Sequence, residues 1–600
     1  MSWELDATDG TRQLSSPLHD GNNPKSLRAS IAAAISMSLS LTTAGRLGFF
    51  IDYSELSDAG THTFYVARTH GSKGAVSVAY ATSGDGHTSV SGVLSWADED
   101  MSIQSFTVAV TPAQLTNHQT TLGLGEHRIV ARLSSPTGGG VLHFGTEETK
   151  AYGVIDNDVL ASDANAVFYD SAAASVGDGT QATPYDSVYT AIAAIGTKRY
   201  LYGKGTTIVD GTLTMPDGVD TIKILPVPST RSGEATRIYV RNWSGSAWTV
   251  KGNGTDTDVS GFFTRDNESF ATYKGITFTE LDTTDLDGSG ASGNCFGILY
   301  TYGTSQSINI EGCVTDDIDG GGNTGAYMLW GVDGGKVWRC TANNIKRLGD
   351  NTTGNTSLFY TYDGKNISVQ RCEATNVGHL TYQKRVEAAF DVSVSVKFCI
   401  DSTPFGVHYG ASNSVTGVPH SYTIVQCNVF NPTIPFANAI IHEAGVNGSN
   451  GSNNGGKHWW CNNVFYQRGG GLVSPVQFRQ AYSAIIFNNI YLDCVRLWKE
   501  TNDSAAYGAV MEYADHEISS GTTLPSHTYE YQGTEEPNSA DLQLVRPDFA
   551  VNDVISDPLF TDAANGDFSL QATSPALTGG VSGTQQGVYL GNFYTIGAAN

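Results

Sequence analysis

Six cysteines recur at nearly constant spacing in the middle of the chain. Cys313, Cys340, Cys372, Cys399, Cys427 and Cys461 follow one another at steps of 27, 32, 27, 28 and 34 residues. Most of them end the same short motif, in which an apolar residue is followed by two variable positions and then cysteine, as in Val337 to Cys340. In two later phrases Asn462 and Asn488 take the cysteine position, which puts Cys461 one position out of register. A fixed period of about 20 to 50 residues with one strand-like phrase per period predicts a solenoid of stacked coils.

The coils are expected to be built from strands. β-branched residues alternate within the phrases, as at Ile367 and Val369, which favours a parallel β-helix over helical hairpins. Stacked asparagines can hydrogen-bond from coil to coil at the ~4.8 Å strand spacing. The alternative, a disulfide framework, fits poorly, because stacked side chains run parallel whereas a disulfide needs a twisted bridge. A zinc site is not indicated either, because the sequence contains no Cys-x-x-Cys pair. We therefore interpret the cysteines as small buried apolar residues.

The composition bounds the function. A chain of 600 residues is expected to hold two or more units, and its net charge of -25 argues against binding to nucleic acid or to an anionic membrane. The first residues lack the basic and apolar pattern of a secretory signal, and the apolar segment 29–41 is too short to span a bilayer. We expect no membrane insertion and a place outside the cell or on a virion surface.

Residues 46–159 alternate apolar and polar positions in short runs, which predicts an antiparallel β-sandwich. The runs Thr63 to Arg68, Ala75 to Tyr80, Phe106 to Val110 and Arg128 to Leu133 are the expected strands. The segment resembles the Calx-β family, on Gly74 to Val78, Gly92 to Trp96, Gly125-Glu126, Leu133 to Pro136 and Ile155 to Asp158.

The resemblance implies a fold and a ligand. Calx-β domains can bind Ca²⁺ through carboxylates at one end, and the matching positions here are Glu55, Glu126, Asp156 and Asp158. The family's Asp-Tyr segment is missing between Ser83 and Gly92, so one expected carboxylate is absent. Hard cations want six or more oxygens, and solvated turn carboxylates are the alternative interpretation. No cofactor is required.

The rest of the chain resembles bacterial right-handed parallel β-helix proteins at both of its ends. Phe168 to Asp170, Gly177 to Thr180 and a helical pattern from Ser187 to Ile195 resemble their entry strand, glycine-rich turn and short capping helix. Asp557 to Phe560, Asn565 to Phe568 and Ser574 to Leu577 resemble their closing motif. The expected fold is all-β: an N-terminal attachment or extended segment (1–45), a Calx-β-like immunoglobulin-type sandwich (46–159), a right-handed parallel β-helix with its capping helix (160–556) and a closing segment (557–600).

A basic stretch lies within this acidic protein. Between Lys336 and Lys397 nine basic residues stand against five acidic ones. Such a stretch could form a surface for an acidic glycan, because fixed positive charges attract carboxylates, or it could be an ordinary solvated face. Arg347 and Lys365 are candidate glycan-binding residues, and Tyr409 and Trp460 could stack on sugar rings.

Within the stretch, His379, Tyr382, Lys384 and Arg385 are expected to lie on a loop after Asn376-Val377-Gly378. β-Elimination from a uronic acid needs a cation against the carboxylate, a base and an acid. Arg385 could be the cation, Lys384 or His379 the base, and Tyr382 the acid. Hydrolysis would instead need two carboxylates across the glycosidic bond. Asp316, Asp317 and Asp319, or Glu387 with Asp391, are the candidates for that chemistry.

Three functions remain open on the sequence alone. The favoured one is a glycan-binding appendage on a virion or cell surface, similar to a phage tailspike, that recognises a polysaccharide or host glycan, assembles as a homotrimer and could depolymerise its ligand. The second is a secreted polysaccharide lyase. The third is a non-enzymatic bacterial adhesin, which would share the fold but lack coupled titratable groups in a cleft.

Overall fold

A computed structural model describes the strand pair 3–5 and 12–14 and most of residues 44–579. The longer gaps within that range are 210–222, 227–235, 285–293, 412–421, 431–440, 445–456, 467–475, 502–510, 521–528, 537–542 and 544–551. Most of the expected N-terminal segment (1–45), the apolar segment 29–41 and residues 580–600 lie outside the described residues. The described part is all-β apart from short helices, as the sequence predicts.

The N-terminal unit is a two-layer sandwich. One sheet has the order β10-β3-β5-β8 and the other β4-β11-β9-β6-β7. The strands are β3 (Arg46–Phe49), β4 (Tyr53–Leu56), β5 (Gly60–Thr69), β6 (Val76–Gly84), β7 (Ser91–Trp96), β8 (Gln104–Val110), β9 (His127–Thr137), β10 (Val141–Leu142) and β11 (Glu148–Ile155). The apolar residues of their alternating runs fill the space between the sheets. All four expected runs are strands here, and only the β10–β3 and β11–β4 pairs are parallel.

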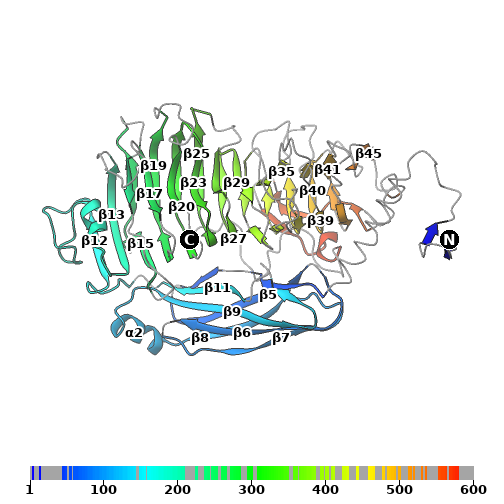
Figure 1. The fold of residues 1–600 in the computed structure, drawn as a ribbon, viewed down its shortest axis with the longest axis horizontal. Helices are drawn as coiled ribbons and strands as arrows, with labels where there is room; N and C mark the ends of the chain where they lie inside the picture. The colour runs from blue at the N-terminus through cyan, green and yellow to red at the C-terminus, as the bar shows by residue number, and fades with distance from the viewer. Residues whose placement is uncertain are drawn as a thin grey trace.

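The second unit is a parallel solenoid in which each coil gives one strand to each of three sheets. We call them the first, second and third sheets. The first contains β12 (Ala166–Asp170), β13 (Tyr200–Val209), β15 (Ile238–Asn242), β18 (Phe270–Lys274), β21 (Ser307–Glu311), β24 (Asp333–Trp338), β27 (Lys365–Gln370), β30 (Val392–Lys397), β33 (Tyr422–Gln426), β36 (Lys457–Cys461), β39 (Ser483–Phe487) and β42 (Met511–Asp515). Figure 1 shows these strands side by side along the long axis of the molecule.

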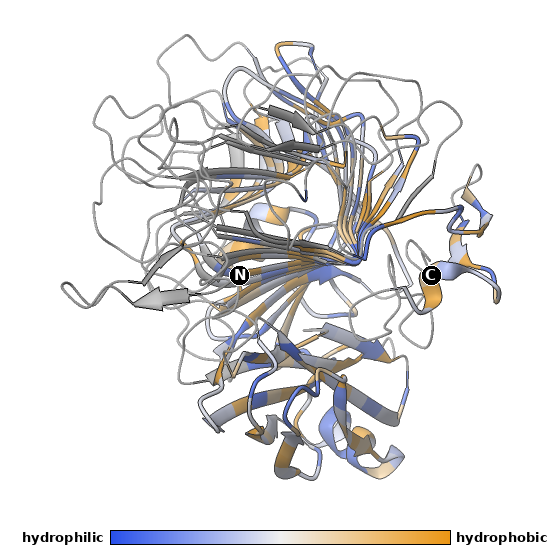
Figure 2. Cartoon of the chain, turned by 90° about the vertical axis from the view of Figure 1, so that its right-hand side faces the viewer, coloured by the Kyte–Doolittle hydropathy of each residue, from blue (hydrophilic) through white to orange (hydrophobic). Residues whose placement is uncertain are grey.

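The other two sheets repeat the pattern. The second contains the end of β13 and then β16 (Trp248–Gly252), β19 (Ile276–Thr283), β22 (Val314–Gly320), β25 (Thr341–Arg347), β28 (Glu373–Thr375), β31 (Ile400–Asp401), β34 (Val429–Phe430), β37 (Val464–Tyr466), β40 (Ile490–Leu492), β43 (Ile518–Ser520) and β46 (Val554–Ile555). The third contains β14 (Lys223–Pro226), β17 (Val259–Arg265), β20 (Cys295–Thr301), β23 (Thr324–Trp330), β26 (Thr356–Tyr362), β29 (His379–Val386), β32 (Val407–Ala411), β35 (Ile441–Ala444), β38 (Val476–Arg479), β41 (Trp498–Thr501) and β44 (Tyr529–Tyr531), with β45 (Thr534–Glu536) antiparallel at its end. Viewed along the solenoid in Figure 2, successive coils superpose.

The cysteine column is real, but its asparagine continuation is shifted by one residue. Buried Cys313, Cys340, Cys372 and Cys399 stack at the corner after the first sheet, and the column continues with Asn428, Asn463 and Asn489. The expected Asn462 and Asn488 instead occupy the corner position before it, where the backbone has a φ of +58° at both residues. Cys461 therefore lies two positions ahead of the column. The described cysteines are all free thiols, as interpreted.

The solenoid begins at a capping helix, whereas the closing segment expected at its other end lies against its flank. The expected helix is α3 (Val188–Ala193), capped by the Ser187 hydroxyl, and its apolar face packs on β12 and β13. The closing segment forms β47 (Phe560–Asp562), β48 (Asp567–Leu570) and the 3-10 turn η4 (Pro575–Leu577). Phe568 and Ala576 pack with Val429, Val464 and Ile490 of the second sheet, so the described part of this segment lies along the flank of the solenoid.

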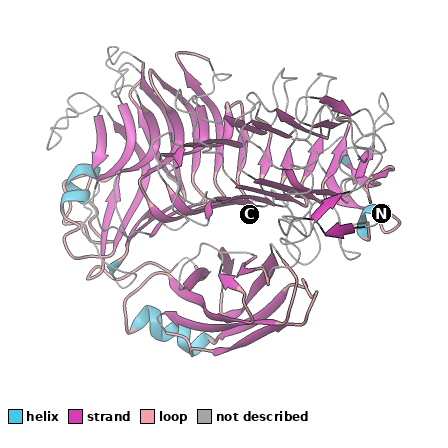
Figure 3. Ribbon diagram, turned by 45° about the vertical axis from the view of Figure 1, so that its right-hand side comes forward, coloured by secondary structure: helices cyan, strands magenta, loops and turns pink. Residues whose placement is uncertain are grey.

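The sandwich lies along the solenoid instead of extending from its end (Figures 1 and 3). Its five-stranded sheet faces the outer surface of the first sheet, where the Tyr53 and Trp338 rings are 4.4 Å apart. Further along, the Lys397 ammonium donates hydrogen bonds to the Phe49 and Phe50 carbonyl oxygens at 3.2 and 3.4 Å. This docking covers one of the three solenoid faces.

Candidate functional site

A row of aromatic side chains runs along the outer face of the third sheet. Backbone register aligns Phe263, Leu299, Met328, Tyr360 and Tyr382 from coil to coil. A second line in the same sheet aligns Trp330 with Tyr362 and then with Lys384. We call the five aromatic residues of these two lines, Phe263, Trp330, Tyr360, Tyr362 and Tyr382, the aromatic row.

The rings of the aromatic row contact one another across the coils. Tyr360 and Tyr382 are stacked with centroids 5.2 Å apart, and Trp330 lies 6.1 Å from Tyr362 and 6.2 Å from Tyr360. Leu299, Met328 and Tyr360 are buried, whereas Phe263, Trp330, Tyr362 and Tyr382 are half-buried. An extended ligand along this face could therefore contact the half-buried rings, of which Trp330, Tyr362 and Tyr382 lie on successive strands about 4.8 Å apart.

Two of the four candidate catalytic residues come together at this row. His379 and Tyr382 are in ring contact, with centroids 4.9 Å apart. Burial raises the pKa of the Tyr382 phenol, against the opposing effect of the nearby Arg347 guanidinium. His379 is only 3% exposed, which keeps it from acting as an accessible base. Lys384 and Arg385 belong to the same strand, and their side chains lie outside the described part of the structure.

The predicted loop around these residues is wrong. His379–Val386 form strand β29, because Thr381 and Gln383 alternate inward and the strand pairs with β26 along its length. A polar sequence there looked like a loop, whereas the solenoid buries threonine and glutamine side chains inside its coils.

The candidate glycan-binding residues separate. Arg347 lies at the end of β25, near Tyr382. Lys365 is the first residue of β27, and Tyr409 lies in β32. The side chains of both are outside the described residues. Trp460 is wrong as a surface residue: it is 1% exposed, because it pairs in register with Val425 and Ile486 and points into the core.

The basic stretch does not form one surface. Lys336 faces the sandwich, with its ammonium 5.4 Å from the Tyr152 ring centroid, and Lys397 is buried at the same interface. Lys346 instead pairs with Asp317 at 3.0 Å on the second sheet. The period of the coils distributes these charges over different faces. The net positive charge of the stretch in the sequence therefore does not form one positively charged surface.

The candidate hydrolytic carboxylates are engaged in the corners of the second sheet. Asp316 accepts a hydrogen bond from the Asn343 amide at 2.9 Å, and Asp319 accepts from the Gly349 backbone at 2.9 Å. Asp317 is held by Lys346. Glu387 and Asp391 lie outside the described residues. These contacts link successive coils.

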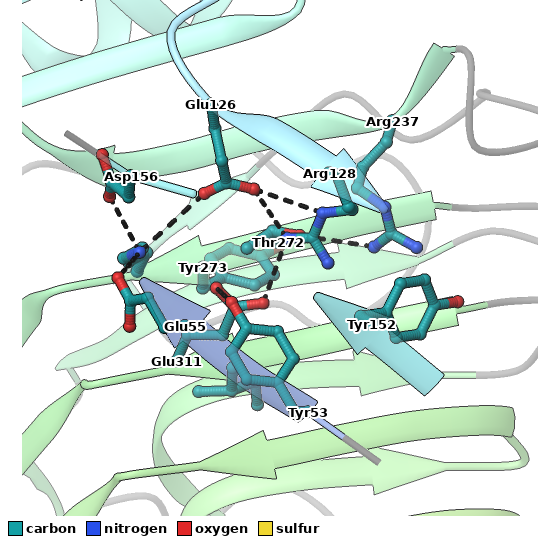
Figure 4. A network of polar contacts seen from close by, with 12 residues as sticks. Tyr53, Glu55, Glu126, Arg128, Tyr152, Asp156, Arg237, Thr272, Tyr273 and Glu311 are labelled. Atoms are coloured by element: carbon teal, nitrogen blue, oxygen red, sulfur yellow. Dashed lines mark hydrogen bonds and ion pairs between the residues drawn. The ribbon is translucent and has the colours of Figure 1, made fainter. Parts of the chain in front are cut away.

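Three of the four residues implied as calcium ligands do converge. Glu55 lies near the end of β4, Glu126 precedes β9 and Asp156 follows β11, and these adjacent strands meet at one end of the five-stranded sheet (Figure 4). Asp158 lies outside the described residues. The end of the sheet faces the solenoid, where basic side chains of the first sheet pair with Glu55 and Asp156, while Glu126 pairs most closely with Arg128 of the sandwich itself.

The contacts form a buried network across the two units. The Lys274 ammonium lies 2.8 Å from Glu55 and 2.8 Å from Asp156. The Arg241 guanidinium donates to Asp156 at 2.7 Å. Arg128 pairs with Glu126 at 2.8 Å and with Glu311 of the solenoid at 3.2 Å, while the Tyr53 hydroxyl donates to Glu311 at 2.6 Å. We call these eight residues the interface network.

The electrostatics follow from burial and pairing. Burial alone would raise the pKa of the Glu126 carboxyl, but Arg128 and Lys274 hold it below its ordinary value. Burial likewise opposes ionisation of Asp156, and Lys274 and Arg241 still lower its pKa. Burial raises the pKa of the Glu311 carboxyl. The cations of the network stay charged, since nearby carboxylates raise the pKa of Lys274 and Arg241 despite burial.

Sequence reasoning missed Arg241, Lys274 and Glu311. They occupy one outward-facing line of the first sheet, paired in register from Tyr202 through Trp338. A signal existed, because charged and aromatic residues alternate with apolar ones at positions that the register places outside the core. Which unit would cover them could not be deduced from spacing alone.

Comparisons with known proteins give limited likeness. No family model and no curated protein matches the chain. Among solved structures, the apo form of the Calx CBD1 domain is 19% identical, with a TM-score of 0.15, and 18% of this chain covers 95% of it. Two calcium-binding CBD12 structures, from CALX1.2 and CALX1.1, are 20% and 18% identical, with TM-scores of 0.16 and 0.15. This chain matches 45% and 50% of their lengths, over 19% and 21% of its own. These scores are too low to support any inference.

Across the described residues, no helix has both the length and the apolar character needed to cross a bilayer.

Proposed function

We propose that this protein is a glycan-binding appendage of a virion or cell surface, in which the aromatic row contacts an extended polysaccharide. The supporting observation is the arrangement of half-buried Trp330, Tyr362 and Tyr382 along one solenoid face that the sandwich leaves uncovered. Aromatic faces pack on the apolar faces of sugar rings while their edges remain free for polar groups.

Charge near the row suggests the type of ligand. The Arg347 guanidinium is close to Tyr382. A glycan carrying carboxylates would gain from this cation, because opposite charges attract most strongly where water is partly excluded. We therefore favour an acidic polysaccharide or host glycan. Assembly as a homotrimer remains part of the proposal, and light scattering on the purified protein would test it.

Binding without cleavage is the form that the described residues favour. The candidate base His379 is buried, and the candidate carboxylates Asp316, Asp317 and Asp319 are held in coil-to-coil contacts. A depolymerising activity would have to come from Lys384, Arg385 or residues outside the described part. The binding experiment below therefore also follows product formation.

The test is calorimetric titration of a panel of acidic and neutral polysaccharides, with ultraviolet absorbance and reducing ends followed in parallel. Trp330→Ala and Tyr362→Ala are each expected to weaken binding of the recognised glycan about tenfold, since a buried aromatic contact contributes roughly 1 kcal/mol or more. Trp243→Ala is the matched control, because Trp243 is a half-buried tryptophan in an early coil whose ring centroid lies 5.1 Å from that of Phe168. Equal affinity in Trp330→Ala and wild type would contradict the proposal, and new absorbance or reducing ends would show cleavage.

A further inference from the structure

The interface network places a lysine at the point where three carboxylates of the sandwich meet. The Lys274 ammonium lies 2.8 Å from Glu55, 2.8 Å from Asp156 and 3.9 Å from Glu126. All three acids come from the sandwich, whereas Lys274 ends strand β18 of the solenoid. One unit supplies the negative charges and the other supplies the central cation.

The arrangement does not fit a calcium ion. Calcium takes six to eight oxygen ligands at about 2.3–2.6 Å. Here the ammonium stands between the oxygens that would have to approach the ion, and the Arg241 guanidinium donates at 2.7 Å to the same Asp156 Oδ2 that the ammonium contacts. An ion placed among these acids would lie against two fixed positive charges. No cluster of three or more metal-ligating residues suited to a metal occurs among the described residues.

The lysine is held rigidly in place. Lys274 pairs in register with Arg241 on one neighbouring strand and Glu311 on the other. Glu311 in turn meets Arg128 and the Tyr53 hydroxyl of the sandwich. The Arg128 guanidinium lies 5.4 to 5.9 Å from the ring centroids of Tyr53, Tyr152 and Tyr239, which excludes water from its faces. A buried acid cluster needs such compensation, because unpaired buried charges are strongly unfavourable.

We propose that Lys274 is a built-in cation that takes the place of a divalent metal ion at this end of the sandwich and thereby fixes the sandwich to the solenoid without any metal. Glu55, Glu126 and Asp156 retain the chemistry of a hard-cation site, but the solenoid satisfies it from within the chain. Removal of the Lys274 charge together with the neighbouring Arg241 charge would leave the three carboxylates open to calcium.

The experiment compares the full-length protein with the double variant Lys274→Met/Arg241→Met, which keeps much of the aliphatic part of both side chains and removes both solenoid cations. Calcium chloride is titrated calorimetrically, and thermal unfolding is recorded with and without millimolar calcium. We expect no calcium binding and no shift of the melting temperature in wild type. The variant is expected to melt several degrees lower in chelator, and to bind calcium and recover part of that loss when it is added.

Lys346→Met is the control, since it removes the same charge from the partly exposed pair with Asp317. It should show neither calcium binding nor a comparable loss. Calcium binding by wild type at the same affinity as the double variant would overturn the proposal, and so would a folded double variant that binds no calcium. If the variant does not fold in chelator, refolding in calcium but not in sodium chloride of equal ionic strength would support the proposal, and failure in both would contradict it.

Discussion

One corner position of the coils shows how single residues specify the stack. Its column begins with four thiols and ends with three amides. Each thiol lies near backbone carbonyls of its own or the previous coil, as Cys340 does at 3.3 and 3.4 Å. The amides do more, because the Asn463 side chain accepts two hydrogen bonds from Asn428 and donates to Val425 and Asn489. Both residue types are small enough to repeat at the strand spacing.

Replacing Asn463 by alanine should therefore destabilise the solenoid. The change leaves the backbone N–H of Asn428 without its acceptor and removes one of the two acceptors of its side-chain amide, which still donates to the Val396 carbonyl oxygen, in a fully buried corner. We expect a loss of about 2–4 kcal/mol in the free energy of unfolding, measured by denaturant unfolding. Asn463→Cys, which copies the residue of earlier coils, should cost less. An equal loss in both variants would contradict the role assigned to the amide.

At the scale of elements, periodicity carried most of the prediction. The sandwich strands, the coils and helix α3 all follow from alternation, repeat length or helical spacing. Helix α2 (Pro112–Thr120) was missed, although its start has a capping box between Thr111 and Gln114. Strand β29 was misread because its inward positions are polar, and Trp460 because the repeat phrase was aligned one residue off. The interface network could not be predicted from the sequence, because contacts between two docked units follow no sequence period.

The sandwich carries a buried histidine cluster that should make it acid-sensitive. His118 and His87 lie 4.9 and 5.6 Å from the ring of His127, whose two nitrogens have no hydrogen-bond partner among the described residues. Burial, with nearby histidines, lowers the pKa of His127 to about 3 and that of His62 to about 4. The unfolded chain binds these protons near pH 6.5, so stability is complete above that pH and falls as the pH drops toward 4.

His127→Leu should reduce this dependence. Each unit of pKa difference corresponds to about 1.4 kcal/mol, so wild type is expected to lose a few kcal/mol between pH 7 and pH 4. The variant should lose distinctly less over the same interval. Thermal unfolding of both proteins across that range is the measurement, and parallel curves would rule out His127 as a source of the acid sensitivity.

For the whole molecule, the docking of the sandwich decides which face remains for ligands. The first sheet is covered by the five-stranded sheet, and part of the second by Phe568 and Ala576 of the closing segment. The aromatic row belongs to the third sheet, which neither contact involves. The sandwich thus acts as part of one rigid body with the solenoid, held by Trp338 and by the interface network.

Trp338→Ala should uncouple the two units. Truncating a fully packed tryptophan costs about 3–5 kcal/mol, and here most of that loss falls on the contact with Tyr53. Scanning calorimetry of wild type is expected to show sandwich and solenoid unfolding together, and the variant to show a separate transition at lower temperature. Trp330→Ala on the aromatic row is the control and should leave a joint transition. Two separate transitions already in wild type would contradict rigid docking.

Side-chain footprinting with hydroxyl radicals, in the presence and absence of a polysaccharide that the protein binds, tests glycan recognition by the aromatic row most directly. Binding along the row should protect Trp330, Tyr362 and Tyr382 from oxidation and leave the half-exposed Trp243 and Tyr65 unchanged. Protection confined to the sandwich, with oxidation of the row unaffected, would contradict the account.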